Sequence, residues 1–151
     1  MTGEKKSVEA AGADVAAAQD ALMRFVRNFG LHQADQTPCG QPLPVSEAYA
    51  LAEVARDGRL RQVELGRRLR LEKSTVSRLV TNLVGRGWLH RHTADGDGRG
   101  VLLDLTPAGV EAAARVAEAR RQRLTTVLTR VPDDERAAVV RALRALAQAT
   151  E

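Results

Sequence analysis

Residues 62–106 constrain the fold of this chain most, because two short helical patterns, a tight turn and a glycine-rich hairpin follow one another without a break. Leu65 and Leu69 share one face of the first helix, and Gly66 leaves room for a second helix to cross closely. Leu71 anchors the turn. The second helix, predicted over residues 73–85, buries an aliphatic face made of Val76, Leu79, Val80 and Leu83. The pattern predicts a helix-turn-helix followed by a hairpin wing.

The opposite face of the second helix is polar. It carries short hydroxyls, an amide and one arginine: Ser74, Thr75, Ser77, Arg78, Thr81 and Asn82. Such groups hydrogen-bond to the base edges and phosphates that double-stranded DNA presents in its major groove. Arg78 can make a bidentate contact to guanine or a phosphate contact, and the sequence leaves both open. We expect further phosphate contacts from Arg61, Gln62, Lys73, Arg86 and Arg91.

The hairpin is predicted from two strand-length stretches, 88–92 and 101–105, on either side of the loop 93–100. Arg99 lies between two glycines at the tip of this loop, where its guanidinium can reach a narrow minor groove. Asp97 either orients Arg99 through an ion pair or is an ordinary turn residue. The loop has too few carboxylates, and no closing Glu, for a calcium site.

Three residues of the first wing strand suggest a site but have simpler explanations. Trp88 is expected to fill the space between the second helix and the wing. His90 and His92 alternate on a strand and share a face, but the sequence shows no third ligand nearby, so we expect no metal ion. A hydrolase that uses either histidine with Ser74 or Ser77 lacks a nucleophile elbow, a phosphate loop and a metal triad. We therefore expect no catalytic residues and no cofactor.

The charge of the chain is concentrated in this region. Residues 56–104 hold 11 Lys and Arg residues against 6 acids, a balance of +5, so the rest of the chain carries −1 of the net +4. A basic face suits an anionic partner such as DNA. Only 3% of the residues are aromatic, which disfavours a stacking platform for single-stranded nucleic acid. The lone cysteine excludes an internal disulfide, and without a membrane segment or a secretory signal we expect a cytoplasmic, nucleoid-associated protein.

Amphipathic helices flank the basic region. One is predicted from Asp14 to about His32, and a segment with three prolines ends it before a second helix that Ser46 can cap. Thr106 and Pro107 predict the start of a long helix that reaches about residue 129, and a last helix follows Pro132. We predict a mainly α, α+β fold. A flexible N-terminal tail occupies residues 1–13, a helical dimerisation bundle occupies residues 14–44 and 107–151, and a winged helix-turn-helix occupies residues 45–106.

Three stretches carry a resemblance to a known family. They are Glu72-Lys73-Ser74-Thr75-Val76-Ser77-Arg78-Leu79-Val80, Arg86-Gly87-Trp88-Leu89-His90-Arg91 and Asp97-Gly98-Arg99-Gly100-Val101-Leu102-Leu103-Asp104-Leu105-Thr106-Pro107-Ala108-Gly109. Together with the order of elements, they resemble the MarR family of bacterial transcriptional regulators. The most specific part is the wing signature, in which Asp, one residue and Arg precede alternating aliphatics and Leu-Thr-x-x-Gly.

The resemblance implies a homodimer with interleaved terminal helices and two winged heads. It implies a regulator, more often a repressor than an activator, that binds a pseudo-palindromic operator. The recognition helix, Ser74 to Asn82 here, enters the major groove in this family, and the wing-tip arginine, Arg99 here, enters the minor groove. The alternative from another class is a winged-helix scaffold that binds protein, which predicts an apolar outer face where this chain has hydroxyls, an amide and an arginine.

The resemblance also raises the question of an effector, since many family members leave DNA when they bind phenolic or other small lipophilic anions. Residues of the first two predicted helices can line such a pocket or belong to the core: Phe25, Arg27, Phe29, His32 and Tyr49. Oxidation of Cys39 is a second possible trigger. Cys39 lies after the first helix, whereas peroxide sensors of the family place their cysteine near its start, and no basic residue adjoins Cys39 in sequence.

Overall fold

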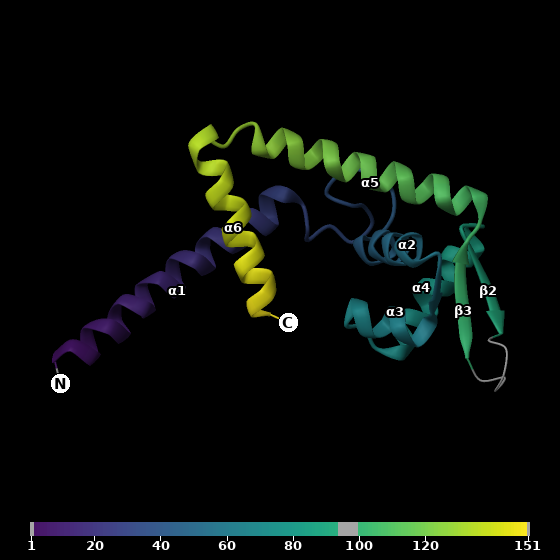
Figure 1. The fold of residues 1–151 in the computed structure, drawn as a ribbon, viewed down its shortest axis with the longest axis horizontal. Helices are drawn as coiled ribbons and strands as arrows, with labels where there is room; N and C mark the ends of the chain where they lie inside the picture. The colour runs from purple at the N-terminus through teal and green to yellow at the C-terminus, as the bar shows by residue number, and fades with distance from the viewer. Residues whose placement is uncertain (1, 94–99, 151) are drawn as a thin grey trace.

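The computed structural model describes residues 2–93 and 100–150. Helices dominate, and one small sheet accompanies them (Figure 1). In chain order the elements are α1 (Thr2–Phe29), α2 (Val45–Asp57), β1 (Arg59–Arg61), α3 (Gln62–Leu69), α4 (Lys73–Gly85), β2 (Leu89–Thr93), β3 (Val101–Leu105), α5 (Pro107–Leu128) and α6 (Asp133–Ala149). The prediction of a mainly helical α+β fold with a winged helix-turn-helix is confirmed.

The helix-turn-helix forms as the sequence predicts, with α4 spanning the predicted range 73–85. Arg70 ends α3 in a left-handed conformation with φ of 53°, and the Leu71 N–H donates to the Gly66 carbonyl at 3.0 Å. A Cβ on Gly66 would lie 3.1 Å from Cγ2 of Val76 on α4. The absence of that atom lets the two helices approach closely, which is the physical reason for glycine at this position.

The sheet has the antiparallel order β1-β3-β2. Strands β2 and β3 are the predicted hairpin, whereas β1 was not predicted, because three residues are too few to show an alternating pattern. In the register of β1 and β3, Leu60 pairs with Leu103, and both side chains are buried against the helices. The sheet therefore has a core face and a solvent face.

The core is aliphatic and lies where α2, α3, α4, the sheet and the first half of α5 meet. Its fully buried large side chains are Leu43, Leu51, Val54, Leu65, Val80, Leu83, Leu89 and Leu103. Trp88 is half-buried and packs against this cluster, which agrees with its predicted role as a filler. This core fixes the recognition helix against the wing.

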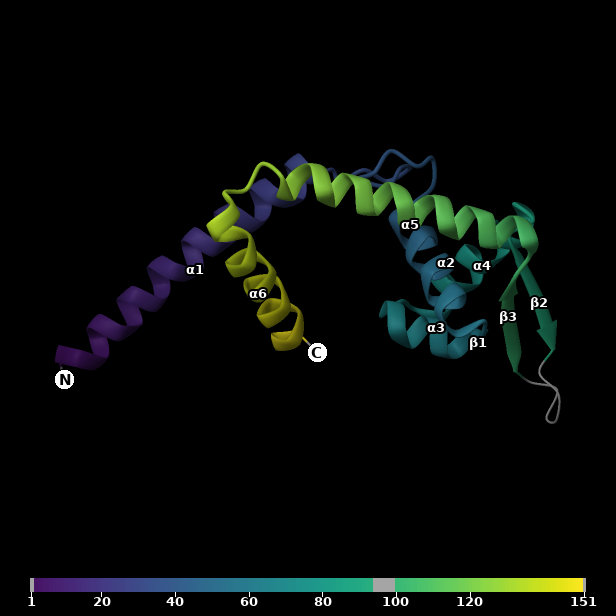
Figure 2. The same ribbon diagram turned by 45° about the horizontal axis from the view of Figure 1, so that its top comes forward.

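Thr106 connects the sheet to the long helix α5. Its Oγ1 accepts from the Gly109 N–H at 2.9 Å and donates to the Gly87 carbonyl at 2.6 Å, so it caps the helix and holds the start of the wing together. Pro107 follows as the first helical residue, which confirms the predicted helix start. From there α5 passes over the winged helix-turn-helix from α2 to β3, here called the head, and continues beyond it to α6 (Figures 1 and 2).

The first two helices differ from the sequence prediction at their starts. Helix α1 begins at Thr2 rather than near Asp14, so the expected tail over residues 1–13 is helical from Thr2 onward. Helix α2 begins at Val45, and Pro44 occupies the N-cap position, so Ser46 lies inside the helix and does not cap it. The fixed φ of proline suits the entry to a helix, and the side-chain cap is dispensable there.

Helix α1 extends away from the head in both views, and α6 lies apart from the head at the far end of α5 (Figure 2). The part of α1 with described side chains exposes Val15 and Leu22 at 65% and 58%, and α6 exposes Leu143 and Leu146 at 55% and 63%. None of the residues in α6 is buried. Within residues 2–93 and 100–150, no helix combines the length and the apolarity that crossing a bilayer requires.

Candidate nucleic-acid interface

The polar face of α4 is accessible, as the sequence predicts. Its six predicted contact residues, Ser74, Thr75, Ser77, Arg78, Thr81 and Asn82, all border one shallow hollow next to the start of α2. Arg78 is exposed on this face. The Thr81 hydroxyl donates to the Ser77 carbonyl at 2.8 Å, so its oxygen remains available only as an acceptor. A row of donors and acceptors along one side of a helix is the arrangement that base-edge recognition requires.

A second groove lies between α3, the start of α4 and the wing strands. It brings together four of the predicted contacts, Gln62, Lys73, Ser77 and Arg91, which are distant in sequence. Arg67 and Arg70 also line this groove and were not predicted. The cations of the groove outnumber Glu72, its one acidic lining residue, so the groove suits a phosphate backbone. Arg61 and Arg86 line neither hollow.

Glu47 is a buried carboxylate at the base of this surface, and sequence reasoning did not single it out. One of its oxygens accepts from Nδ2 of Asn82 at 3.2 Å. The other lies 3.4 Å from Nε of Arg86 but outside hydrogen-bond geometry. The Arg86 guanidinium also stacks over the Trp88 ring at 5.2 Å. Two predicted DNA contacts, Asn82 and Arg86, are thus held by one anion from the first turn of α2, where the helix dipole favours negative charge.

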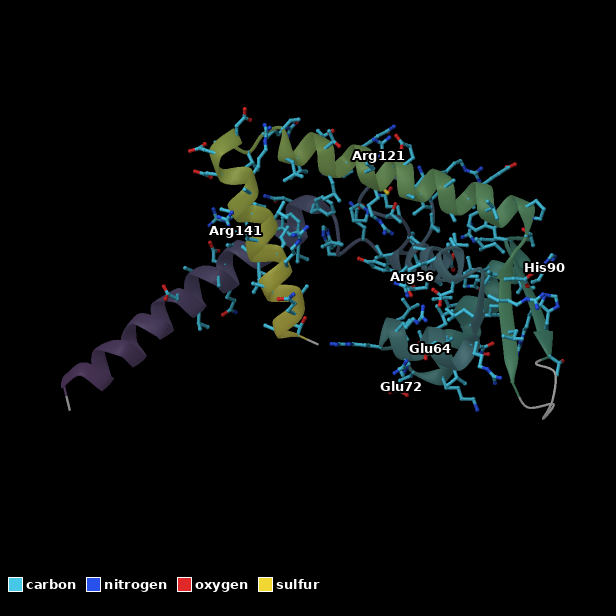
Figure 3. The ribbon with its side chains drawn as sticks, in the orientation of Figure 1. Arg56, Glu64, Glu72, His90, Arg121 and Arg141 are labelled. Atoms are coloured by element: carbon cyan, nitrogen blue, oxygen red, sulfur yellow. The ribbon has the colours of Figure 1, made fainter. Side chains whose placement is uncertain are left out.

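Arg68 carries a charge that is already compensated. Its guanidinium pairs with Glu53 at 3.1 Å, Asp57 at 2.7 Å and Glu64 at 2.8 Å, which joins α3 to α2. Hydrogen bonds from Arg67 and then Arg68 lower the pKa of Glu64 from its ordinary 4.5 to about 2. Figure 3 shows Glu64 at α3, in the part of the head below α5. These pairs contribute to the docking of α3 rather than to the attraction of phosphate.

The two faces of the wing strands differ. Arg91 shares a face with Leu89 and Leu103 and lines the groove beside α4, whereas His90 and His92 lie on the solvent face. Asp104 of β3 lies beside both histidines, with Oδ1 2.6 Å from Nε2 of His92. The premise that no third ligand is near them is therefore wrong. Asp97 and Arg99 lie outside the described residues, so their predicted roles stay predictions.

A cavity of about 220 Å³ lies between α1, the loop after it, α2 and α5. Three of the five predicted pocket residues, Phe25, Phe29 and Tyr49, line it, but Arg27 and His32 do not. Two arginines of α5 provide the charge instead: Arg120 stacks on Tyr49 at 5.2 Å and Arg123 on Phe29 at 5.5 Å. Periodicity in α1 does not reveal what α5 brings to the cavity, so the sequence suggested Arg27 and did not point to Arg120 or Arg123.

Cys39 also lines this cavity and is half-buried. Its sulfur lies 3.0 Å from the Thr37 hydroxyl. Oxidation of Cys39 remains a prediction from the sequence.

The sequence and fold of this chain are similar to those of known proteins. A model described as the MarR family matches residues 41–100, which hold α2, the helix-turn-helix and the first wing strand. PcaV, a transcriptional regulator from Streptomyces coelicolor, has a solved structure that is 27% identical, covers 71% of this chain and 79% of its own, and superimposes with a TM-score of 0.62. The chain is thus similar to MarR-family transcriptional regulators, and the match to the family model spans its helix-turn-helix and the start of its wing.

The chain is also similar to other transcriptional regulators. An uncharacterized HTH-type transcriptional regulator of Mycobacterium leprae is 26% identical over 116 residues, which are 77% of this chain and 78% of that protein. A mutant of MarR from E. coli, solved in complex with operator DNA, has the same fold at 22% identity and a TM-score of 0.60, over 69% of this chain and 75% of that one. PcaV has also been solved with its natural ligand.

Proposed function

We propose that this protein is a homodimeric repressor of the MarR type that binds a pseudo-palindromic operator and leaves it when a small lipophilic anion occupies the cavity beside α5. The observation that carries the proposal is the exposed polar face of α4, which is flanked by the basic groove between α3 and the wing. In this arrangement α4 enters the major groove and the wing, with Arg99, enters the minor groove.

The DNA-binding part of the proposal rests on two groups of side chains, one placed to contact bases and one placed to contact phosphates. Arg78 is exposed on the face of α4 that reads bases, whereas Lys73, Arg70 and Arg91 line the groove that suits a phosphate backbone. Phosphate contacts position a protein on DNA, and base contacts give it specificity. Replacement of Arg78 is therefore expected to reduce sequence discrimination, and replacement of Lys73 to weaken binding to all sequences alike.

The dimer part rests on the apolar surfaces of α1 and α6. Val15 and Leu22 of α1 and Leu143 and Leu146 of α6 are more than half exposed in one chain. Exposed apolar side chains repeated along two protruding helices are unfavourable in water and favour burial against an equivalent surface. A second copy of the chain supplies that surface and places two heads on two half-sites of one operator.

The effector part rests on Arg123. Its Nε is buried and has no hydrogen-bond partner among the described residues, although it lines an otherwise largely apolar cavity. A carboxylate or phenolate on an aromatic ligand would satisfy this donor while its ring packs against Phe29 and Tyr49. The cavity joins α2 of the head to α1 and α5, so a ligand that fits only one orientation of the head shifts the protein toward that orientation.

The DNA-binding proposal is tested by selecting genomic fragments on the purified protein and measuring the enriched duplex by fluorescence anisotropy across a salt series. We expect an inverted repeat bound by two chains. Arg78→Ala and Arg99→Ala should each weaken binding by about 1–3 kcal/mol, whereas Arg121→Ala, on the outer side of α5, should not (Figure 3). Weak binding that depends only on salt, with no shared sequence, would favour the protein-binding scaffold instead.

The effector proposal is tested with a panel of aromatic carboxylates and their neutral alcohols. Carboxylates that bind wild type should dissociate the operator complex, Arg123→Ala should lose the preference for the anion, and Arg121→Ala should keep it. Spin labels on the two recognition helices should report a changed separation when the ligand binds. Ligands that release DNA without altering this separation would contradict the mechanism.

A further inference from the structure

The solvent face of the wing sheet holds three side chains with metal-binding atoms, contributed by two strands. In the β2–β3 register, His90 pairs with Asp104 and His92 pairs with Leu102. Side chains alternate along a strand, so His90, His92 and Asp104 all stand on one face, opposite the buried Leu89 and Leu103. Figure 3 shows His90 at the outer side of the sheet, away from the helices. The protein's proposed DNA-binding face and effector cavity use none of these three residues.

The distances within the cluster suit one ion. Nε2 of His92 lies 2.6 Å from Oδ1 of Asp104, and Nδ1 of His90 lies 3.9 Å from Oδ2. The three ligand atoms lie within 4.8 Å of one another. In a tetrahedral zinc site with bonds of about 2.1 Å, ligand atoms are roughly 3.4 Å apart. The observed distances lie on either side of that value, so small side-chain rotations on a fixed sheet suffice to form the site.

The donor set selects the class of metal. We propose that His90, His92 and Asp104 bind one zinc ion, or a similar borderline transition-metal dication, at the base of the wing. Two imidazoles and a carboxylate are ligands that zinc accepts, and they leave a fourth position for water. Calcium and magnesium prefer oxygen ligands alone. The imidazole side chains are 54% and 48% exposed, so an ion from solvent can reach them.

One positive charge opposes this site. Arg59 of β1 pairs in register with Asp104 and therefore shares its face. Among the residues that the structure describes, no ion pair joins Arg59 to Asp104, and each Asp104 oxygen lies toward a histidine. Arg59 lowers the affinity for a dication through repulsion without taking a ligand. Arg59→Gln is expected to strengthen metal binding.

The bound ion would link β2 to β3. These strands form the hairpin that carries the wing loop. The backbone ladder between β2 and β3 holds them together, and most of β2 is exposed to solvent. A metal bridge between two strands restrains local opening. Zinc is therefore expected to slow amide hydrogen exchange in residues 89–93 and 101–105, and to leave α6 unaffected.

The test uses the untagged full-length chain, which has three histidines in all. Zinc titration by calorimetry should give one ion per chain for wild type. His90→Ala, His92→Ala and Asp104→Asn should each weaken binding at least tenfold, and the control His32→Ala should not. Protons compete with the metal for imidazole nitrogen, so affinity should fall when the pH is lowered from about 7.5 to about 5.5.

A second measurement on the wild type avoids dependence on the folding of the variants. In the NMR spectrum, zinc should shift the ring resonances of His90 and His92 and leave those of His32 in place, with reversal by a chelator. The proposal is overturned if wild type shows no saturable zinc binding, or if His32→Ala loses binding while the His90 and His92 variants keep it. Ring shifts confined to His32 would overturn it as well.

Discussion

Gly109 offers the sharpest test of how the wing is joined to α5. It lies in the first turn of α5, directly against the backbone at Trp88. A Cβ at position 109 would lie 1.9 Å from the Trp88 carbonyl oxygen, 2.9 Å from its carbonyl carbon and 3.2 Å from its Cα. That oxygen accepts from the Thr106 N–H at 3.1 Å. The obstacle is backbone, so no side-chain rotation relieves it.

The cost of Gly109→Ala follows from three contributions. Alanine gains about 1 kcal/mol over glycine in a helix. Overpacking costs about 1–3 kcal/mol, and weakening the bond from Thr106 to Trp88 costs about 1 kcal/mol more. Because the overlap is more than 1 Å deep against rigid backbone, the upper end applies, and we expect a net loss of about 3 kcal/mol. For a chain of this size that lowers the melting temperature by roughly 6–12 °C.

The assay is urea unfolding followed by far-ultraviolet circular dichroism at one fixed protein concentration. Gly85→Ala is the matched control, because a Cβ at that position of α4 meets nothing within 4 Å. We expect Gly85→Ala to be neutral or stabilising by up to about 1 kcal/mol. The reasoning is refuted if Gly109→Ala unfolds within about 0.5 kcal/mol of wild type, or if the two substitutions behave alike.

Three further predictions concern the cap, the acid network and Glu47. Thr106→Ala should destabilise the protein by about 2 kcal/mol in the same urea assay, since a helix cap and a bond to a carbonyl are both lost, and Thr106→Ser should recover most of it. Because the pKa of Glu64 is lowered to about 2, its ionised form stabilises the fold above pH 4.5, and that contribution is lost as the pH falls toward 2. Arg68→Met should therefore shift the acid-unfolding midpoint, measured by circular dichroism, to higher pH; an unchanged midpoint would contradict this. Glu47→Gln removes the anion beside Arg86. The slope of log affinity for DNA against log salt concentration should therefore become steeper by up to about 1. A shallower slope would argue against Arg86 as a phosphate contact.

The sequence by itself determined the elements whose causes are local. The period of Val76, Leu79, Val80 and Leu83 located α4, and Thr106 with Pro107 located the start of α5. Helix periodicity, caps and turn residues act over a few positions, so they are visible in a linear string. The same local pattern also placed the polar face of α4 on the outside, which led to the interpretation as a DNA-binding helix.

Only the tertiary structure decided which distant residues meet. Strand β1 forms because it pairs with β3, with Leu60 opposite Leu103. Glu47 accepts a hydrogen bond from Asn82 because α2 packs on α4. The cavity takes Arg120 and Arg123 from α5 rather than Arg27 and His32 from the first helix and its end, which the sequence had suggested. The solvent face of the wing gains Asp104 beside two histidines through strand register. Such contacts depend on strand register and helix packing, which a linear pattern does not encode, so the head could be predicted while its sites could be completed only in three dimensions.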